Sequence, residues 1–175
     1  LSYIGETHGD ILNYDGWIDM FGWSGDNTTA PFGVSSSTTE SDYSGNFVDW
    51  GTNRIGEHAP NTWRTLTYGE WFYLIQGRDN YSSLYGIAQV NGVNGFILLP
   101  DNWTRPDGVT FKSGFSSESS AEAYGKYQTY TAEEWSKLES AGAVFLPASG
   151  ARSGSNVSGT QNYGQYWSSS NYLGY

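Results

Sequence analysis

Side chains that could carry acid–base or nucleophilic chemistry are few in this sequence, and their spacing does not suit it. His8 and His58 are the only histidines, and neither lies in a His-x-x-x-His or His-Glu-x-x-His motif. We therefore expect surface loop residues rather than metal ligands or general bases. The serines lack the Gly-x-Ser-x-Gly motif of a hydrolase nucleophile. The absence of cysteine excludes thiol nucleophiles, thiolate zinc sites and disulfides.

Pairs of carboxylates are the next candidates for chemistry. Glu133 and Glu134 are neighbours on a predicted helix, where adjacent side chains point in different directions. Glu134 also fits a helix-capping role. Asp15 and Asp19 could approach each other on one helical turn, an arrangement that more often faces solvent than serves catalysis. These patterns favour a protein that is not an enzyme.

Acidic residues gather in the first third of the chain. Residues 1–60 contain a strong excess of carboxylates over a single base, Arg54. Solvated surface loops would explain this excess. Loops stabilised by calcium would explain it too, because Ca²⁺ takes clustered carboxylate and carbonyl oxygens. Calcium near residues 10–49 is therefore the one cofactor that the sequence suggests, and both interpretations stay open.

The elements that would position any site follow a repeated pattern. The motif Thr-x-x-Glu-Trp begins at Thr67 and again at Thr131, and each copy is followed by an apolar strand that ends in Leu-Pro. Thr at the N-cap and Glu three residues later form a capping box. We predict helices over 68–76 and 132–140, the second with Gly142 at C′. The inward side chains, including two indoles buried against one sheet, would be Trp71, Leu74, Ile75, Trp135 and Leu138.

Strand patterns lie between and after these helices. Tyr85–Val90 and 96–99 are predicted strands, and the two Asn-Gly pairs between them favour a hairpin. A core strand is predicted over 144–146 and a last strand over 165–168. Long loops are expected over 24–62, 104–130 and 153–165, and a short helical turn near 18–21.

Composition favours a soluble α+β protein. The chain has 175 residues, which favours a single domain over 1–175, and its mean hydropathy is −0.53. No apolar run approaches the roughly 20 residues of a membrane helix. Aromatic residues make up 17% and glycine numbers 23, which favours short strands and long ordered loops over a helical bundle. The net charge of −10 repels phosphate backbones and argues against nucleic-acid binding.

Several longer motifs resemble a known family. They are Gly-Trp-Ile-Asp-Met-Phe-Gly-Trp over 16–23, Val-Asn-Gly-Val-Asn-Gly-Phe-Ile-Leu-Leu-Pro-Asp-Asn-Trp over 90–103, Leu-Glu-x-Ala-Gly-Ala-Val-Phe-Leu-Pro-Ala-x-Gly over 138–150, and Tyr-Trp-Ser-Ser-Ser over 166–170. Together they look like the repeated paralogous surface domains of gut Bacteroidetes. Those domains are similar to the C-type-lectin-like fold, in the branch shared by formylglycine-generating enzymes and the variable proteins of diversity-generating retroelements.

The resemblance implies a C-type-lectin-like domain with two short helices packed on small antiparallel or mixed sheets. Family members have further strands before Leu1 and beyond Tyr175, so we expect these terminal strands to be lacking here. The resemblance also implies an extracellular or cell-surface location and a binding or adhesion role. The cysteine pair of formylglycine-generating enzymes is missing, as are the Glu-Pro-Asn, Gln-Pro-Asp and Trp-Asn-Asp triplets of calcium-dependent lectins. An inactive relative of those enzymes and a structural repeat of a larger surface protein stay open as alternatives.

The resemblance also implies where a ligand would bind. The variable proteins display changeable side chains near the C-terminal end of the scaffold, which matches residues 152–175 here. The Asn, Tyr, Ser and Gly content of this region suits an adaptable surface for a protein or glycan. The 104–130 loop would help, Trp167 would anchor the scaffold, and Arg152 would either pair with an acid or lie in the face. The candidate ligand-binding residues are Asn156, Asn162, Tyr163, Tyr166, Asn171 and Tyr172.

Overall fold

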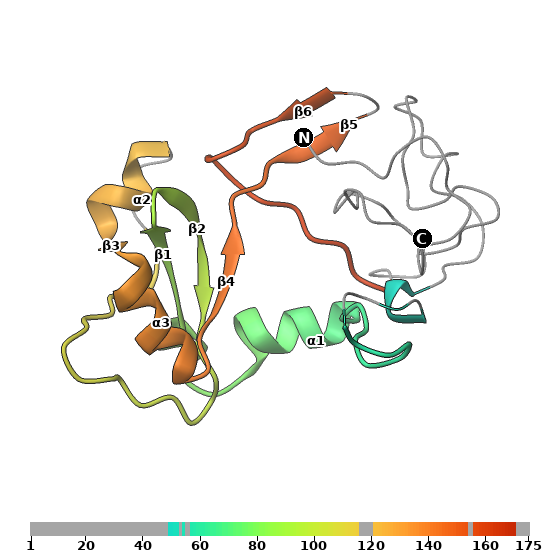
Figure 1. Ribbon diagram of the computed structural model, residues 1–175, viewed down its shortest axis with the longest axis horizontal. Helices are drawn as coiled ribbons and strands as arrows, with labels where there is room; N and C mark the ends of the chain where they lie inside the picture. Colours follow the sequence, from blue (N-terminus) through green and yellow to red (C-terminus); the bar gives the residue numbers. More distant parts are fainter. Residues whose placement is uncertain (1–48, 53, 55–56, 116–120, 154–155, 171–175) are drawn as a thin grey trace. The chain divides into compact units, whose positions relative to one another are not determined.

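A computed structural model describes residues 49–52, 54, 57–115, 121–153 and 156–170 (Figure 1). The chain divides into two compact units. The terminal unit comprises Leu1–Tyr68, Arg152–Asn156 and Tyr166–Tyr175, and the sheet unit comprises Gly69–Ala151 and Val157–Gln165. The helical turn predicted near 18–21 and the Asp15–Asp19 pair lie outside the described residues.

The sheet unit is built on a four-stranded mixed sheet, which makes the fold α+β. Its strand order is β3-β1-β2-β4. Strand β1 pairs antiparallel with β2 and parallel with β3, and β2 pairs antiparallel with β4. The strands are β1 (Tyr85–Val90), β2 (Val93–Leu98), β3 (Thr129–Tyr130) and β4 (Val144–Pro147). A separate two-stranded sheet joins β5 (Ala151–Ser153) to β6 (Asn156–Ser158).

The β1–β2 hairpin confirms one predicted strand and corrects the other. Strand β1 has the predicted bounds, whereas β2 begins at Val93 rather than at residue 96. Only the first Asn-Gly pair forms the turn. Asn91 and Gly92 have φ angles of 47° and 81°, as both central residues of a type I′ hairpin turn require. The second pair, Asn94-Gly95, lies inside β2. The Asn94 backbone hydrogen-bonds to Ala148 and Gln161 rather than within a turn.

Three short helices accompany the sheet, one more than the sequence predicted. They are α1 (Tyr68–Phe72), α2 (Ala121–Tyr127) and α3 (Ala132–Ser140). Helix α2 and strand β3 occupy part of the segment that was predicted to be a long loop over 104–130, so that prediction was wrong for its second half. None of the helices in the described ranges is long and apolar enough to span a membrane.

Helix α3 has the predicted bounds because local signals define both of its ends. The Thr131 hydroxyl accepts from the Glu134 amide at 3.2 Å, and the Glu134 carboxylate accepts from the Thr131 amide at 2.8 Å. This is the predicted capping box. Beyond the C-terminus, Gly142 has a φ of 91°, the left-handed conformation expected at C′. Glu134 is therefore a capping residue, and the Thr131 hydrogen bonds lower its pKa.

Helix α1 departs from ideal geometry after Phe72. It continues as the π-helical turn η4 (Tyr73–Gly77). The predicted helical span over 68–76 is therefore confirmed, but its second half is π-helical rather than α-helical. The predicted buried face is only half-buried at Trp71, Leu74 and Ile75. The expectation of a buried indole at Trp71 was therefore wrong.

A hydrophobic core cluster lies on one face of the sheet, and Ile87 and Leu98 are buried on the other. Ala88, Ile97 and Leu138 are fully buried in this cluster, and α3 contributes the last of these. Trp135 packs against this core at 5.6 Å from the Phe145 ring centroid, but its indole is half-buried rather than buried. Strand β4 lies at the sheet edge with Val144 52% exposed. The strand predicted over 144–146 is confirmed as β4, but its expected burial was wrong, because an edge strand has a neighbouring strand on one side only.

Tyr130 connects the core to a measurable pH dependence. Its ring is 3% exposed, and burial, with a smaller effect of Glu134, raises its pKa from 10.0 to about 12. The neutral phenol is thus favoured in the folded state. Its contribution to the free energy of unfolding is full below pH 10.0 and is lost as the pH rises to about 12.

We expect the free energy of unfolding to fall more steeply over this alkaline window in the wild type than in Tyr130→Phe, which cannot ionise there. Denaturant titrations at several pH values would measure both slopes. Equal slopes would mean that Tyr130 is no more shielded from solvent in the folded chain than in the unfolded one.

The terminal unit contains a short 3-10 helix, η3 (Trp50–Thr52), held by Asp49. The Asp49 carboxylate accepts from the amides of Gly51 and Thr65, each at 2.8 Å. No strand is present at 165–168, where the sequence predicted one. Residues 168–170 instead run beside 66–68, with the Ser169 amide donating to the Leu66 carbonyl at 2.9 Å.

Candidate functional site

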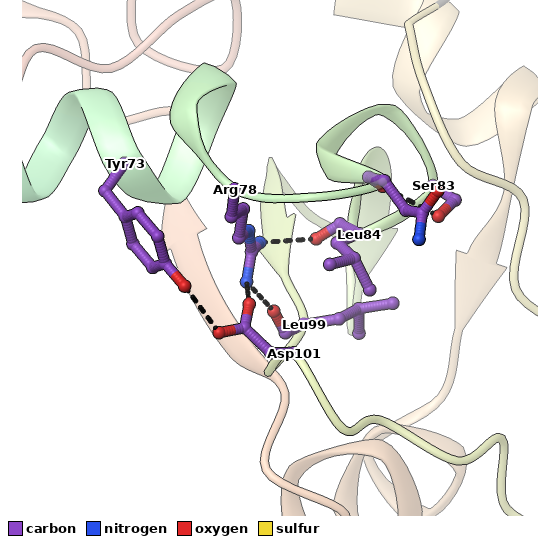
Figure 2. Close-up of polar contacts among 7 residues, drawn as sticks. Tyr73, Arg78, Ser83, Leu84, Leu99 and Asp101 are labelled. Carbon is purple, nitrogen blue, oxygen red and sulfur yellow. Dashed lines mark hydrogen bonds and ion pairs between the residues drawn. The ribbon is translucent and has the colours of Figure 1, made fainter.

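The most closely connected charged cluster in the described chain centres on Arg78, directly after η4 (Figure 2). Its guanidinium side chain is 2% exposed and donates to the carbonyl oxygen of Leu99 at 2.6 Å and of Leu84 at 3.1 Å. It also pairs with Asp101 at 3.1 Å, and Asp101 accepts from the Tyr73 hydroxyl at 2.8 Å. Arg78 therefore ties the end of η4 to the backbone beside both strands of the hairpin.

The protonation states of this cluster fit a structural clamp better than a catalytic site. The hydrogen bond from Tyr73, followed by that from Arg78, lowers the pKa of Asp101. The same hydrogen bond to Asp101 raises the pKa of Tyr73. Asp101 therefore stays ionised and Tyr73 stays neutral around neutral pH. Neither group is poised to exchange a proton there, as a general acid or base must be.

A group of aromatic rings lies on the sheet face opposite Ala88 and Ile97. Side chains alternate between the two faces along a strand, so Tyr85 and Phe96 point away from those two residues. Tyr85 lies 5.3 Å from Phe96 and 5.2 Å from Phe115, between ring centroids. Tyr81 lies 6.3 Å from Tyr85. The ring contact of Tyr85 with Phe96 depends on the hairpin register, which the local sequence does not specify.

The turn over 159–165, which follows β6, has a tightly defined backbone. The Gly150 amide donates to the Tyr163 carbonyl at 2.6 Å, and the Gln165 amide donates to the Gly150 carbonyl at 3.3 Å. Gly150 has a φ of 81°, and a Cβ there would lie 2.2 Å from the Ser158 carbonyl oxygen. Only glycine fits this close backbone approach. The first strand of the two-stranded sheet and the turn are thereby joined.

Two predicted binding residues, Asn162 and Tyr163, lie next to each other in this turn. Both are exposed, and the Tyr163 side chain is 44% accessible. The Asn162 carbonyl accepts from the Tyr124 hydroxyl of α2 at 2.7 Å. Helix α2, which lies in the 104–130 segment that was predicted to help the binding face, thus contacts the backbone of this turn.

The other predicted binding residues are not brought to this turn within the sheet unit. Asn156 begins β6 and Tyr166, 40% exposed, belongs to the terminal unit. Asn171 and Tyr172 lie outside the described residues, and Arg152 is placed only as part of β5. Trp167, which was expected to anchor the scaffold, is 42% exposed.

The terminal unit carries exposed rings of its own. Trp63 is 54% exposed, and the ring of His58 meets it edge-on at 5.1 Å between centroids. His58 is itself exposed, as the sequence predicted for a loop histidine. His8 lies outside the described part of the chain.

The described residues do not form a recognisable metal site. The described residues contain no group of three or more His, Asp or Glu side chains that could hold a metal ion. Of the acids over 10–49, only Asp49 is described, and its carboxylate already accepts two backbone amides. The calcium hypothesis thus rests on residues outside the described ranges.

The described surface therefore offers exposed phenol, indole and amide groups around well-held backbone rather than an acid–base or metal centre. Such groups suit the binding of a partner. No family model, no curated protein and no solved structure matches this chain.

Proposed function

We propose that this chain is a non-enzymatic binding or adhesion module on a C-type-lectin-like scaffold, displayed at a bacterial or phage surface or secreted. It binds a protein or glycan through the amide and phenol side chains of its C-terminal region. The motifs that resemble Bacteroidetes surface domains motivate the scaffold and the location. The α+β architecture with a mixed sheet is compatible with them.

One observation carries the binding role: the turn over 159–165 combines a held backbone with exposed side chains. The carbonyl groups of Asn162 and Tyr163 accept from Tyr124 and Gly150. The side chains of the same two residues are exposed. A side chain on a held backbone loses less conformational entropy on binding than one on a mobile loop. Tyrosine adds a large contact area with few rotatable bonds.

The charge and the rings limit the class of partner. A chain with a net charge of −10 favours a neutral or basic ligand. Exposed tyrosine rings can stack on the apolar faces of sugars and can also fill pockets of a protein partner. A neutral glycan or a neutral to basic surface protein fits both properties.

The test is a binding screen of the full chain against immobilised neutral and basic glycans and purified surface proteins. We expect at least one ligand to bind, and Tyr163→Ala to weaken that binding by about tenfold or more, because central aromatic contacts dominate binding energies. The melting temperature should change by no more than a few degrees, since the ring is exposed.

Tyr81→Ala is the matched control, because Tyr81 is 39% exposed in the same unit but belongs to the aromatic group rather than to the turn. It should leave binding unchanged. Failure of every ligand to bind would contradict the proposed function. Equal losses in both variants, or none in Tyr163→Ala, would place the site elsewhere.

A further inference from the structure

Gln161 has a backbone conformation that its residue type rarely adopts. Its φ is 67°, in the left-handed region. The other described non-glycine residues with positive φ are all asparagine, namely Asn61, Asn80 and Asn91. Asparagine tolerates this region better than most residues, whereas glutamine has no such preference. Strain of this kind persists only where the surroundings hold the residue in place.

The surroundings of Gln161 replace a rung of the β-sheet. Strand β4 ends at Pro147, and the next residue, Ala148, still donates its amide to the Asn94 carbonyl at 2.7 Å. The Asn94 amide donates to the Gln161 side-chain oxygen at 2.8 Å. The Gln161 amide in turn donates to the Ala148 carbonyl at 2.7 Å. Gln161 is thus inserted between the two backbones where the β2–β4 ladder ends.

The Asn94 side chain holds the same residue from a second direction. Its amide nitrogen donates to the Gln161 carbonyl at 2.9 Å and to the Ala121 carbonyl, at the start of α2, at 2.7 Å. Its oxygen accepts from the Gln89 side chain at 3.0 Å. Asn94 is only 4% exposed, so these bonds form in a buried setting where an unmade bond is costly.

We infer that Gln161 and Asn94 are positioning residues for binding: they lock the turn in a strained shape that presents Asn162 and Tyr163 before a ligand arrives. The inference rests on the proposed function of that pair. The lock joins Gln161 to Asn94 of β2 by two hydrogen bonds and to Ala148, directly after β4, by a third. Preorganisation of this kind strengthens binding by removing the cost of ordering the turn.

A simpler role would make Gln161 an ordinary turn residue whose side chain is incidental. Glycine would then serve at least as well, because it adopts positive φ without steric cost. Glutamate offers the complementary change, since it keeps an oxygen that can accept from the Asn94 amide. The pair Gln161→Gly and Gln161→Glu therefore separates backbone strain from side-chain bonding.

Hydrogen exchange of the full chain measures the lock without any ligand. In Gln161→Gly, we expect the Asn94 amide to exchange about tenfold faster, the loss expected for one hydrogen bond. The Ile97 amide, inside the sheet, should keep its wild-type rate. Gln161→Glu should keep the Asn94 amide near its wild-type rate. Unchanged exchange in the glycine variant, or equal acceleration of Asn94 and Ile97, would overturn the inference.

Binding to the same panel of immobilised glycans and surface proteins then tests the functional half. We expect Gln161→Gly to bind about tenfold more weakly and Gln161→Glu to bind nearly as the wild type. Wild-type binding by the glycine variant, together with loss of binding in Tyr163→Ala, would overturn the positioning role and leave the proposed function standing. If neither Gln161→Gly nor Tyr163→Ala weakens binding, the site lies elsewhere and the positioning role is overturned. No binding by the wild type would overturn the proposed function and this role with it, whatever the exchange rates show.

Discussion

Replacing Gly95 with alanine is expected to lower the free energy of unfolding by about 3 kcal/mol or more, at the upper end for overpacked sites. Gly95 lies in β2 opposite Pro147 of β4. A Cβ at this position would lie 2.3 Å from the Phe145 ring and 2.6 Å from the Leu146 carbonyl oxygen. The Phe145 ring is packed against Trp135, and the carbonyl belongs to the paired strand. The missing side chain of Gly95 therefore makes room for Phe145 to cover the core.

Gly125→Ala is the matched control, because it adds the same methyl group to a different environment. A Cβ there would meet the Gln89 side chain at 3.6 Å, an ordinary contact distance. Within α2, alanine should also stabilise the helix by up to about 1 kcal/mol. Denaturant unfolding of both variants measures the contrast. A loss below about 1 kcal/mol in Gly95→Ala would mean that β4 can move away from β2 at little cost.

Replacing Arg78 with methionine is expected to cost about 2–4 kcal/mol of unfolding free energy. Methionine keeps much of the aliphatic volume but removes every donor. The carbonyl oxygens of Leu84 and Leu99 would lose the guanidinium that bonds them (Figure 2). The cost comes from those carbonyl groups rather than from the ion pair, since the Asp101 side chain is 57% exposed.

Asp101→Asn separates these two contributions. It removes the negative charge while Arg78 keeps its two carbonyl partners, so the expected loss is below about 1 kcal/mol, as for an exposed ion pair. Thermal or denaturant unfolding of both variants, with Tyr73→Phe as a third, measures the division. If Asp101→Asn cost as much as Arg78→Met, the ion pair would be the stabilising element and the clamp role would be wrong.

The elements that short-range signals define were predictable from the sequence. Helix α3 begins at its capping box and ends before Gly142. The hydrogen bonds that set each end join residues only a few positions apart in the chain. Strand β1 and the Asn91-Gly92 turn follow in the same way from alternation and from the two positive φ angles that the turn requires. In these cases the partners of each residue are its near neighbours in the chain, so the local pattern contains the whole cause.

Predictions failed where the cause lies in a distant segment. The apolar residues of β4 predicted a core strand, but the sheet order leaves that strand at an edge. Strand β3 has only two residues, and its pairing with β1 gives it strand structure that its own sequence does not announce. Helices α1 and α3 carry the same local motif, yet α3 buries Leu138 whereas no residue of α1 is buried. Burial depends on which surfaces meet, and a motif does not specify its partner.

The candidate site also combines features that the sequence indicates with features that depend on distant segments. Composition and resemblance drew attention to Asn162 and Tyr163 from the sequence alone, and their exposure is what a binding role requires. Gln161 drew no attention, because glutamine in a Gly/Ser/Asn loop carries no signal for a left-handed φ. Its conformation is decided by Asn94, 67 residues earlier in the chain. The sequence thus determined which side chains are available for contact. Only the tertiary structure decided how the turn is held, because its hydrogen-bond partners are brought together by the sheet.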